Sequence, residues 1–162
     1  GAEGVAMGTR FMTTQESPLH GNFKKLSIEK GVTDTLYSKR VDGICCRVLK
    51  TASAEWAVRR GLDWFAAFSN SRDIAAQLKL PYAKLFLGVL ASGWKNAVQL
   101  AYMANGFKAF KVATEDGDLE KGILPVGQAT GLVRDEPTVK EMIDRMVSEA
   151  RRVNGKLSGQ LD

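Results

Sequence analysis

The first segment of this chain is the only one with the pattern of a buried strand. Residues 4–12 alternate small and apolar side chains, with no helix-stop residue at the start of the run. The rest of the sequence favours helices, turns and at most one hairpin. A single core strand leaves backbone donors and acceptors open along both of its edges. We therefore expect its partner strands to lie outside these 162 residues, so that the chain is part of a larger fold.

The composition is that of a globular protein. With 44% hydrophobic and 25% charged residues, the chain can bury a core without disulfides or a metal, which excludes a disordered tail and a small disulfide-bonded scaffold. No stretch approaches the roughly 20 apolar residues that a membrane span needs, so we expect no membrane partner. The sequence begins at Gly1 without an initiator methionine or a basic-then-apolar leader, and we expect that residues preceding Gly1 were removed or not recorded.

The cysteines argue for a reducing compartment and against a metal site. Cys45 and Cys46 are neighbours, and a disulfide between adjacent residues is strained. We expect free thiols, which are typical of a cytoplasmic protein. One histidine and this cysteine pair do not provide the usual spacing of zinc ligands, so no metal site is predicted.

The net charge of +5 raises the question of an anionic partner, such as a phosphate-bearing cofactor. The basic residues occur in short pieces, without an aromatic-interleaved stripe or a known nucleic-acid module. This pattern favours a solvated basic surface and predicts no nucleic-acid partner.

Local signals divide the chain into four parts. We expect a strand and helix over 1–33, a mostly helical excursion over 34–121, a closing segment with a helix over 122–155, and a tail over 156–162. The first helix should span 17–30. The segment 35–51, with a turn at Asp42-Gly43, fits a hairpin or an irregular excursion. Further helices are predicted on both sides of a break at 69–71, as two short helices over 81–104, and from 107 to 113.

The strongest helical pattern covers 138–153. Its apolar residues share one face, and Glu141 and Arg145 are spaced for a favourable pair. Other aromatic side chains at helical spacing are expected to serve in helix packing rather than in stacking on a cofactor; they are Trp56, Trp64, Phe65, Phe68, Trp94 and Tyr102.

Three blocks of sequence resemble one known family. A strand that turns through Met7-Gly8-Thr9 into a helix resembles the last βα unit of a parallel barrel, where loops hold phosphate. Residues 1–11 look like the final barrel strand of the nitronate monooxygenases, formerly called 2-nitropropane dioxygenases. Residues 126–135 with Pro137-Thr138 resemble the closing segment of that family, and 42–51 its excursion after the barrel.

The resemblance implies the fold class. It is α/β: the C-terminal segment of an FMN-binding TIM (β/α)8 barrel, the segment itself mostly α-helical with one core strand. In the family, a nitronate donates an electron to the flavin, and oxygen completes its conversion to a carbonyl compound and nitrite. The implied partner is a small-molecule substrate, and the missing N-terminal half of the barrel or a second copy would complete the fold. We expect the chain alone to be inactive and to hold little flavin.

Related blocks leave other functions open. They occur in nicotinamide-dependent quinone reductases and in flavin-dependent enoyl reductases of fatty-acid synthesis. An alternative from another class is a free-standing helical protein-interaction module. Its +5 charge would serve an acidic partner.

The resemblance places the cofactor contacts at two points of the chain. Met7, Gly8 and Thr9 would contact the FMN phosphate, because Gly8 lets the backbone approach while amides and the Thr9 hydroxyl donate. Gln128 could reach the flavin or satisfy buried backbone groups. Arg10 could pair with an acid or assist the phosphate, the pairing being favoured. His20 does not match the family's histidine motif and is expected at the surface or in a cap, so no catalytic residue is assigned.

Overall fold

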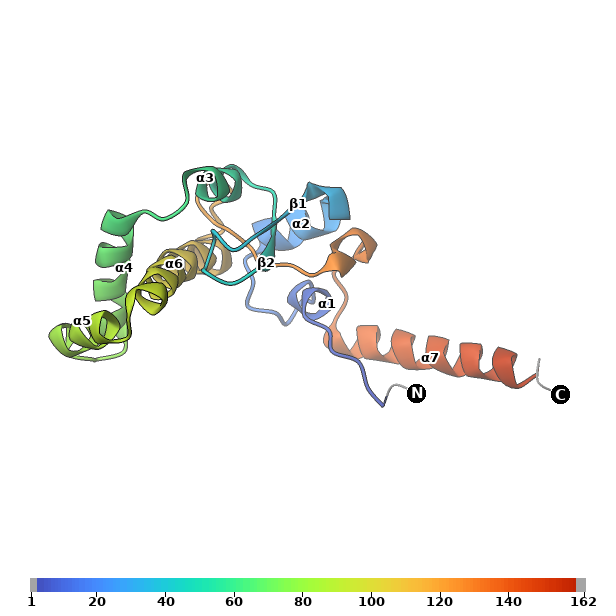
Figure 1. The fold of residues 1–162 in the computed structure, drawn as a ribbon. Coiled ribbons are helices and arrows are strands. Elements are labelled where there is room, and N and C mark those ends of the chain that lie inside the picture. The colour runs from blue at the N-terminus through green and yellow to red at the C-terminus, as the bar shows by residue number, and fades with distance from the viewer. Residues whose placement is uncertain (1–2, 160–162) are drawn as a thin grey trace.

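The computed structural model describes residues 3–159 and is mostly helical, as the sequence predicted (Figure 1). The two strands form a hairpin near the middle of the molecule, and helices extend from it on both sides. The elements are α1 (Thr9–Met12), α2 (Gly21–Glu29), η1 (Val32–Asp34), β1 (Thr35–Ser38), β2 (Cys46–Leu49), α3 (Ala52–Arg60), α4 (Trp64–Gln77), α5 (Tyr82–Ala91), α6 (Trp94–Lys111), η2 (Val112–Asp116), η3 (Gln128–Leu132) and α7 (Val139–Ser158).

The hairpin β1–β2 organises the core. The strands are antiparallel, with Thr35 opposite Leu49, which confirms the hairpin alternative for 35–51. The closing segment runs beside β2: the Leu49 amide donates to the Leu124 carbonyl at 3.0 Å, and the Val126 amide donates to the Arg47 carbonyl at 2.9 Å. Two small apolar clusters lie against this arrangement, one of Leu19, Phe23, Leu49, Ala113, Leu124 and Val126, the other of Val41, Val48, Ala54 and Ile123.

The predicted core strand over 4–12 is wrong for this chain. Residues 4–7 form no regular element, Val5 is 81% exposed, and the chain then turns into the short helix α1 at Thr9. The physical reason is that a strand needs a neighbour for its backbone groups, and no strand within 3–159 lies beside this segment. The hydroxyls of Thr13 and Thr14 instead donate to the carbonyls of Arg10 and Phe11, closing the helical turn.

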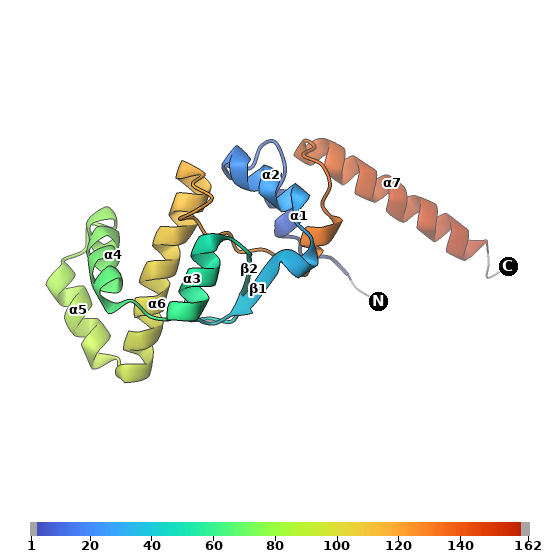
Figure 2. The same ribbon diagram turned by 90° about the horizontal axis from the view of Figure 1, so that it is seen from above.

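Helices α4, α5 and α6 form a separate group at one end of the molecule (Figures 1 and 2). The predicted break at 69–71 is wrong, because α4 runs through it. The polar side chains there are used inside the helical group: the Ser71 hydroxyl donates to the Phe68 carbonyl at 2.8 Å, and the Asn70 amide donates to Asn105 on α6 at 2.9 Å. The break lies earlier, at Gly61, whose φ of 76° ends α3.

The two helices predicted over 81–104 are present, but the second does not stop at Asn105-Gly106. Helix α6 continues to Lys111, so that residues 107–111 are part of it. Gly106 is needed for close packing rather than for a helix end, because a Cβ there would lie 2.8 Å from the Cβ of Asp42. Asn105 donates to the Asp63 carbonyl at 3.0 Å and ties α6 to the start of α4.

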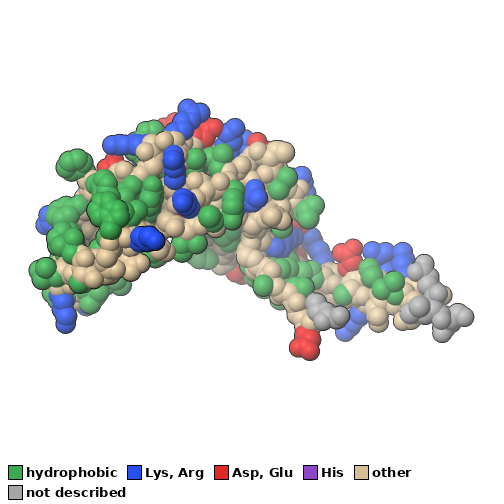
Figure 3. Space-filling model, in the orientation of Figure 1, with side chains coloured by type: hydrophobic (Ala, Val, Ile, Leu, Met, Phe, Trp, Pro, Cys, Tyr) green, Lys and Arg blue, Asp and Glu red, His purple; other side chains and the backbone are tan. Residues whose placement is uncertain are grey.

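Most of the predicted packing aromatics are not covered by the residues of this chain. Phe65 is 91% and Trp94 73% exposed, and Trp56, Trp64 and Phe68 are about half exposed. They contribute to a broad apolar surface over the α4–α6 end of the molecule (Figure 3). Trp64, Trp94 and Phe68 still pack against rings of neighbouring helices, as expected, although they remain partly exposed; Phe65 has no such aromatic contact within 3–159.

Helix α7 confirms the strongest helical prediction and extends away from the body (Figure 2). It begins with a capping box in which the Glu141 carboxylate accepts from the Thr138 amide at 3.0 Å. Because Glu141 is used there, Arg145 pairs with Asp135 rather than in the predicted Glu141 pair. The helix runs to Ser158, so the tail predicted from 156 is helical at its start; residues 160–162 lie outside the described part.

Candidate functional site

The fold brings the two predicted cofactor segments together. The Gly127 amide donates to the Thr9 hydroxyl oxygen at 2.6 Å, although the two residues are 118 positions apart. Thr9 is buried, and a Cβ on Gly127 would lie only 3.1 Å from its Oγ1. The N-terminal turn of α1 and the start of η3 therefore form one continuous backbone surface.

Gly8 supplies the open part of that surface. It is exposed, and no atom lies within 4 Å of the place a Cβ would take. Gly8 is the residue immediately before α1. The first hydrogen bond within the helix runs from the Met12 amide to the Gly8 carbonyl at 3.1 Å, so the amides between these two residues have no acceptor inside the helix. Met7 beside it is half-buried. The backbone here is accessible to a ligand, whereas the Thr9 hydroxyl is buried against Gly127.

Gln128 lies next to this contact, with its side chain on the surface. It is exposed and makes no side-chain hydrogen bond to the part of the chain that is described, so the alternative role of satisfying buried backbone groups is wrong. That role belongs to the buried Thr130, whose hydroxyl donates to the Gly127 carbonyl at 2.8 Å. Sequence reasoning missed Thr130, although a threonine three residues after a glycine is a recognisable turn signal.

Arg10 pairs with an acid, as favoured from the sequence. Its guanidinium donates to the Asp135 carboxylate at 2.7 Å and to the Asp135 carbonyl at 3.0 Å. The hydrogen bond from Arg145, aided by Arg10, holds the pKa of Asp135 below its usual value. The carboxylate thus stays ionised at neutral pH, and this link between α1, the closing segment and α7 weakens only as the pH falls through that lowered pKa.

A buried lysine makes a second link that the sequence did not indicate. Lys24 on α2 is 5% exposed; its ammonium donates to the Glu136 carboxylate at 3.0 Å and to the Gln15 carbonyl at 3.3 Å. The Gln15 amide also donates to the Pro137 carbonyl at 3.1 Å. These contacts fix Glu136 and Pro137 against the N-terminal segment.

His20 is a capping residue, which confirms one of its two expected roles. Its Nδ1 accepts from the Asn22 amide at the start of α2, at 3.2 Å. The ring lies against Gly117, at the end of η2. It therefore helps to join α2 to the end of α6 and η2, rather than facing the Thr9–Gly127 contact.

Cys45 and Cys46 are free thiols in different surroundings. Cys45 is exposed, while Cys46 is half-buried in β2. Burial, reinforced by the nearby carboxylate of Asp42, raises the pKa of Cys46 to about 12. Arg47, which the sequence placed beside both thiols, directs its guanidinium to the Thr35 hydroxyl at 2.7 Å and does not activate Cys46.

We expect the two thiols to react at very different rates. At about pH 8, a maleimide should modify Cys45 at least tenfold faster than Cys46, because the thiolate is the reactive form. Mass spectrometry of peptides after timed labelling measures both rates. The Cys45→Ser variant should lose nearly all fast labelling, while Cys46→Ser should keep it. Equal rates at the two positions in the folded protein would contradict the burial of Cys46.

The Thr9–Gly127 bond can be tested by removing its acceptor. Thr9→Val keeps the shape but leaves the Gly127 amide without a partner, and we expect a loss of about 1–3 kcal/mol in the free energy of unfolding. Thr33→Val, at an exposed position, is the control and should stay within about 0.5 kcal/mol of the parent. Denaturant unfolding measures both. A Thr9→Val variant as stable as the control would show that the bond does not hold the two segments together.

Two features are absent from the described residues. Within 3–159, no three histidine, cysteine, aspartate or glutamate side chains lie close enough together to hold a metal ion. In the same part of the chain, no helix combines the length and apolar character needed to cross a bilayer.

Comparison with known proteins identifies the family. The model of the nitronate monooxygenase family matches residues 1–149. A curated relative from Rhodococcus jostii (strain RHA1), named (3aS,4S,5R,7aS)-5-hydroxy-7a-methyl-1-oxo-octahydro-1H-indene-4-carboxyl-CoA dehydrogenase, is 37% identical over 157 residues. The protein of the same name from Mycobacterium tuberculosis (strain ATCC 25618 / H37Rv) is 32% identical over 155 residues. This chain belongs to the nitronate monooxygenase family.

The chain spans less than half of the curated relatives it matches. Each of the two alignments covers 93% of this chain and 44% of the relative. The solved structure of FabK from Thermotoga maritima is similar over 98% of this chain and 40% of its own, with 25% identity and a TM-score of 0.60. A point mutant of the same protein gives 24% identity and a TM-score of 0.62, over 98% of this chain and 37% of its own.

Proposed function

We propose that this chain is the C-terminal part of an FMN-dependent oxidoreductase with a TIM-barrel fold. The observation that carries the proposal is the Thr9–Gly127 bond, which joins the two segments expected at the cofactor. The family and the two curated relatives, both named as dehydrogenases, support oxidation–reduction chemistry. The free thiols fit a cytoplasmic protein.

The residues present fit the phosphate end of a flavin. The open space at Gly8 lets a phosphate approach the backbone, and the amides that follow Gly8 lack helical acceptors. In this proposal Met7, Gly8 and Thr9 contribute backbone contacts, while Gln128 reaches the cofactor with its exposed amide side chain. Thr9 positions Gly127 by accepting its amide hydrogen, a bond that does not use the hydroxyl's own hydrogen. A bound flavin supplies the electron-transfer chemistry, and these residues hold and orient it.

Flavin content tests the cofactor proposal. We expect the full-length protein to purify with about one FMN per chain, whereas residues 1–162 alone should hold little, because the remaining barrel strands or a second copy complete the site. Gly8→Val in the full-length protein should weaken FMN binding by at least about tenfold, since branched side-chain atoms would fill the open space at the phosphate. Gly4→Val, where a Cβ also meets no atom within 4 Å, is the control. Stoichiometric FMN on residues 1–162 alone would overturn the divided site.

Two substrate classes are in question for the full-length enzyme. The family supports the oxidation of a nitronate with oxygen. The names of the two curated relatives favour a second candidate, a bicyclic carboxyl-CoA thioester. Quinone reduction and enoyl-thioester reduction with a nicotinamide remain alternatives within the same class.

A direct assay separates these candidates. The flavin-loaded full-length protein is mixed with an alkyl nitronate and oxygen, and nitrite is measured; in parallel, a bicyclic hydroxyacyl-CoA is offered with NAD(P)+, and NAD(P)H is measured. Nitrite formation supports the nitronate oxidation, and NAD(P)H formation supports the thioester. If the protein turned over only a quinone or an enoyl thioester, with NAD(P)H as reductant, that substrate would replace both candidates. Failure of all these substrates would contradict the proposed oxidoreductase.

A further inference from the structure

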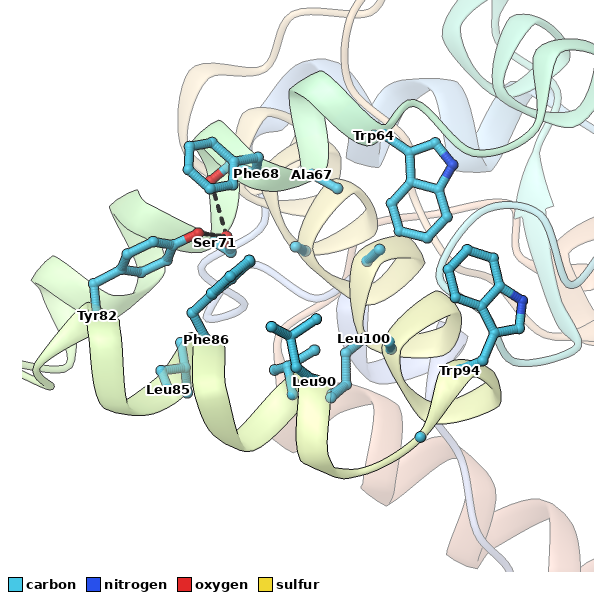
Figure 4. Close-up of a pocket in the computed structure, with 15 residues that line it drawn as sticks. Trp64, Ala67, Phe68, Ser71, Tyr82, Leu85, Phe86, Leu90, Trp94 and Leu100 are labelled. Carbon is cyan, nitrogen blue, oxygen red and sulfur yellow. Dashed lines mark hydrogen bonds between the residues drawn. The ribbon is translucent and has the colours of Figure 1, made fainter.

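We propose that the cavity between α4, α5 and α6 binds a flat apolar ring system that carries one anionic group. The cavity measures about 250 Å³, lies between the three helices and opens to solvent, so that Trp94, Leu90 and other lining side chains are partly exposed (Figure 4). Each of the three helices contributes to it. It lies at the end of the molecule formed by α4–α6, while α1 lies near the middle in both ribbon views, so this inference does not depend on the proposed flavin site.

The walls of the cavity are aromatic and uncharged. Trp64 and Trp94 stand beside one another at one end, with ring centroids 5.5 Å apart. At the other end, Phe68 meets the edges of Tyr82 and Phe86 at 5.7 and 6.1 Å. Aromatic walls of this kind favour flat rings, which stack or meet them edge to face. The volume equals that of roughly eight water molecules, enough for a ligand of about two rings.

The cavity floor is made of small residues, which keep the space open. Ala97, Ala101 and Ala104 on α6 line it together with Gly93, whose φ of 90° sets the turn between α5 and α6. The Asn70–Asn105 hydrogen bond, outside the lining, joins α4 to α6 beside this space. An apolar hollow of this size leaves apolar side chains in contact with water, and an apolar ligand would bury that surface.

One polar pair lies within the aromatic wall. The Ser71 and Tyr82 hydroxyls are 3.1 Å apart, and the Ser71 hydroxyl also lies 2.8 Å from the Phe68 carbonyl (Figure 4). These hydroxyls already have hydrogen-bond partners within the protein, so a ligand needs no strongly polar group at this end of the cavity. The charged group of a ligand must therefore remain at the rim.

The three helices around the cavity carry more positive than negative charge. Residues 64–114 contain five lysines and Arg72 against one acid, Asp73, while Asp63 beside Trp64 is paired with Arg60 at 3.0 Å. Lys84 lines a second hollow that shares Leu85, Val89 and Leu100 with the cavity, and Lys95 follows Trp94 directly. Neither lysine takes part in an ion pair within residues 3–159. These charges complement an anionic ligand and disfavour a second copy of the same surface, whose lysines would repel.

A pair of matched dyes tests the proposal in the full-length protein with its flavin bound. Anilinonaphthalene sulfonate has the flat apolar body and one anionic group; phenylnaphthylamine has the same body without the charge. We expect saturable binding of one sulfonate dye per chain, and weaker binding of the neutral dye. The Lys84→Gln, Lys95→Gln double variant should weaken binding of the sulfonate dye by about tenfold, because it removes two exposed positive charges. Binding of the neutral dye should be unchanged.

Variants whose side chains fill the cavity provide a second test of the proposal. Ala101→Phe should weaken both dyes by about tenfold or more, because the ring occupies the ligand space. Val89→Trp, on α5, is the second blocking variant should Ala101→Phe not fold, as judged by thermal unfolding. Phe65→Ala, on α4 but outside the lining, is the control and should bind both dyes as the parent does. Absence of saturable binding, or binding that folded blocking variants leave unchanged, would overturn the proposal.

Discussion

Replacing Phe23 with alanine should lower the free energy of unfolding by about 3–5 kcal/mol, the cost of emptying a fully buried aromatic site. Phe23 is completely buried in α2 and belongs to the cluster that joins α2, β2 and the closing segment. A Cβ added to Gly122 would lie 2.8 Å from the tip of its ring, so the surrounding backbone is already closely packed. The variant should therefore loosen the attachment of residues 122–126 as well as α2.

Phe65→Ala is the matched control for this experiment. The same residue type is replaced, but Phe65 lies on α4 and is 91% exposed. Its replacement should therefore lower the free energy of unfolding by less than about 0.5 kcal/mol. Urea unfolding followed by circular dichroism measures both variants. If Phe23→Ala were no more costly than Phe65→Ala, the cluster around Phe23 would not be the core of this part of the molecule.

Replacing Gly117 with alanine should cost about 3 kcal/mol or more, for two separate reasons. Gly117 has a φ of 64°, a left-handed conformation that costs a residue with a Cβ about 1–2 kcal/mol. The new Cβ would also overlap the His20 ring, which must then move and lose its bond to the Asn22 amide. Overpacking of this kind adds about 1–3 kcal/mol.

Two control variants separate these causes. Gly155→Ala, in α7 with nothing within 4 Å of the added Cβ, should be neutral or stabilise by about 0.5–1 kcal/mol. In a protein that already carries His20→Ala, the Gly117→Ala change should cost less than it does in the parent, because the ring that the new Cβ overlaps is gone. Thermal unfolding of the four variants provides the comparison. A Gly117→Ala protein as stable as the Gly155→Ala protein would contradict the contact between His20 and Gly117.

Local sequence signals were sufficient where the structure depends on neighbouring residues. The turn at Asp42-Gly43 made a hairpin one of the two structures expected for 35–51, and the short runs beside it do pair with each other. Helix α7 follows from Thr138, which caps it, and from the apolar spacing that begins at Val139. In both cases the partners of the backbone groups lie within the same short segment.

Local signals failed where the deciding contact is distant. The break expected at 69–71 does not occur, because Asn70 finds its partner on α6, and Gly106 does not end α6, because it packs against Asp42. The segment 4–8 has the side chains of a buried strand but no strand beside it among residues 3–159. A strand pattern states only which residues can be buried, while a strand requires a neighbour to hydrogen-bond with.

The sequence by itself determined the helical character, the closing helix and the family, and it left 35–51 as either a hairpin or an irregular excursion. It also named Thr9 and the segment around Gln128 as parts of one site. Only the tertiary structure decided that Thr9 holds Gly127, that Lys24 and Arg10 fasten the closing segment, and that α4–α6 form a hollow with aromatic walls. The physical reason is that these contacts join residues far apart in the chain, and their geometry depends on how separate elements pack.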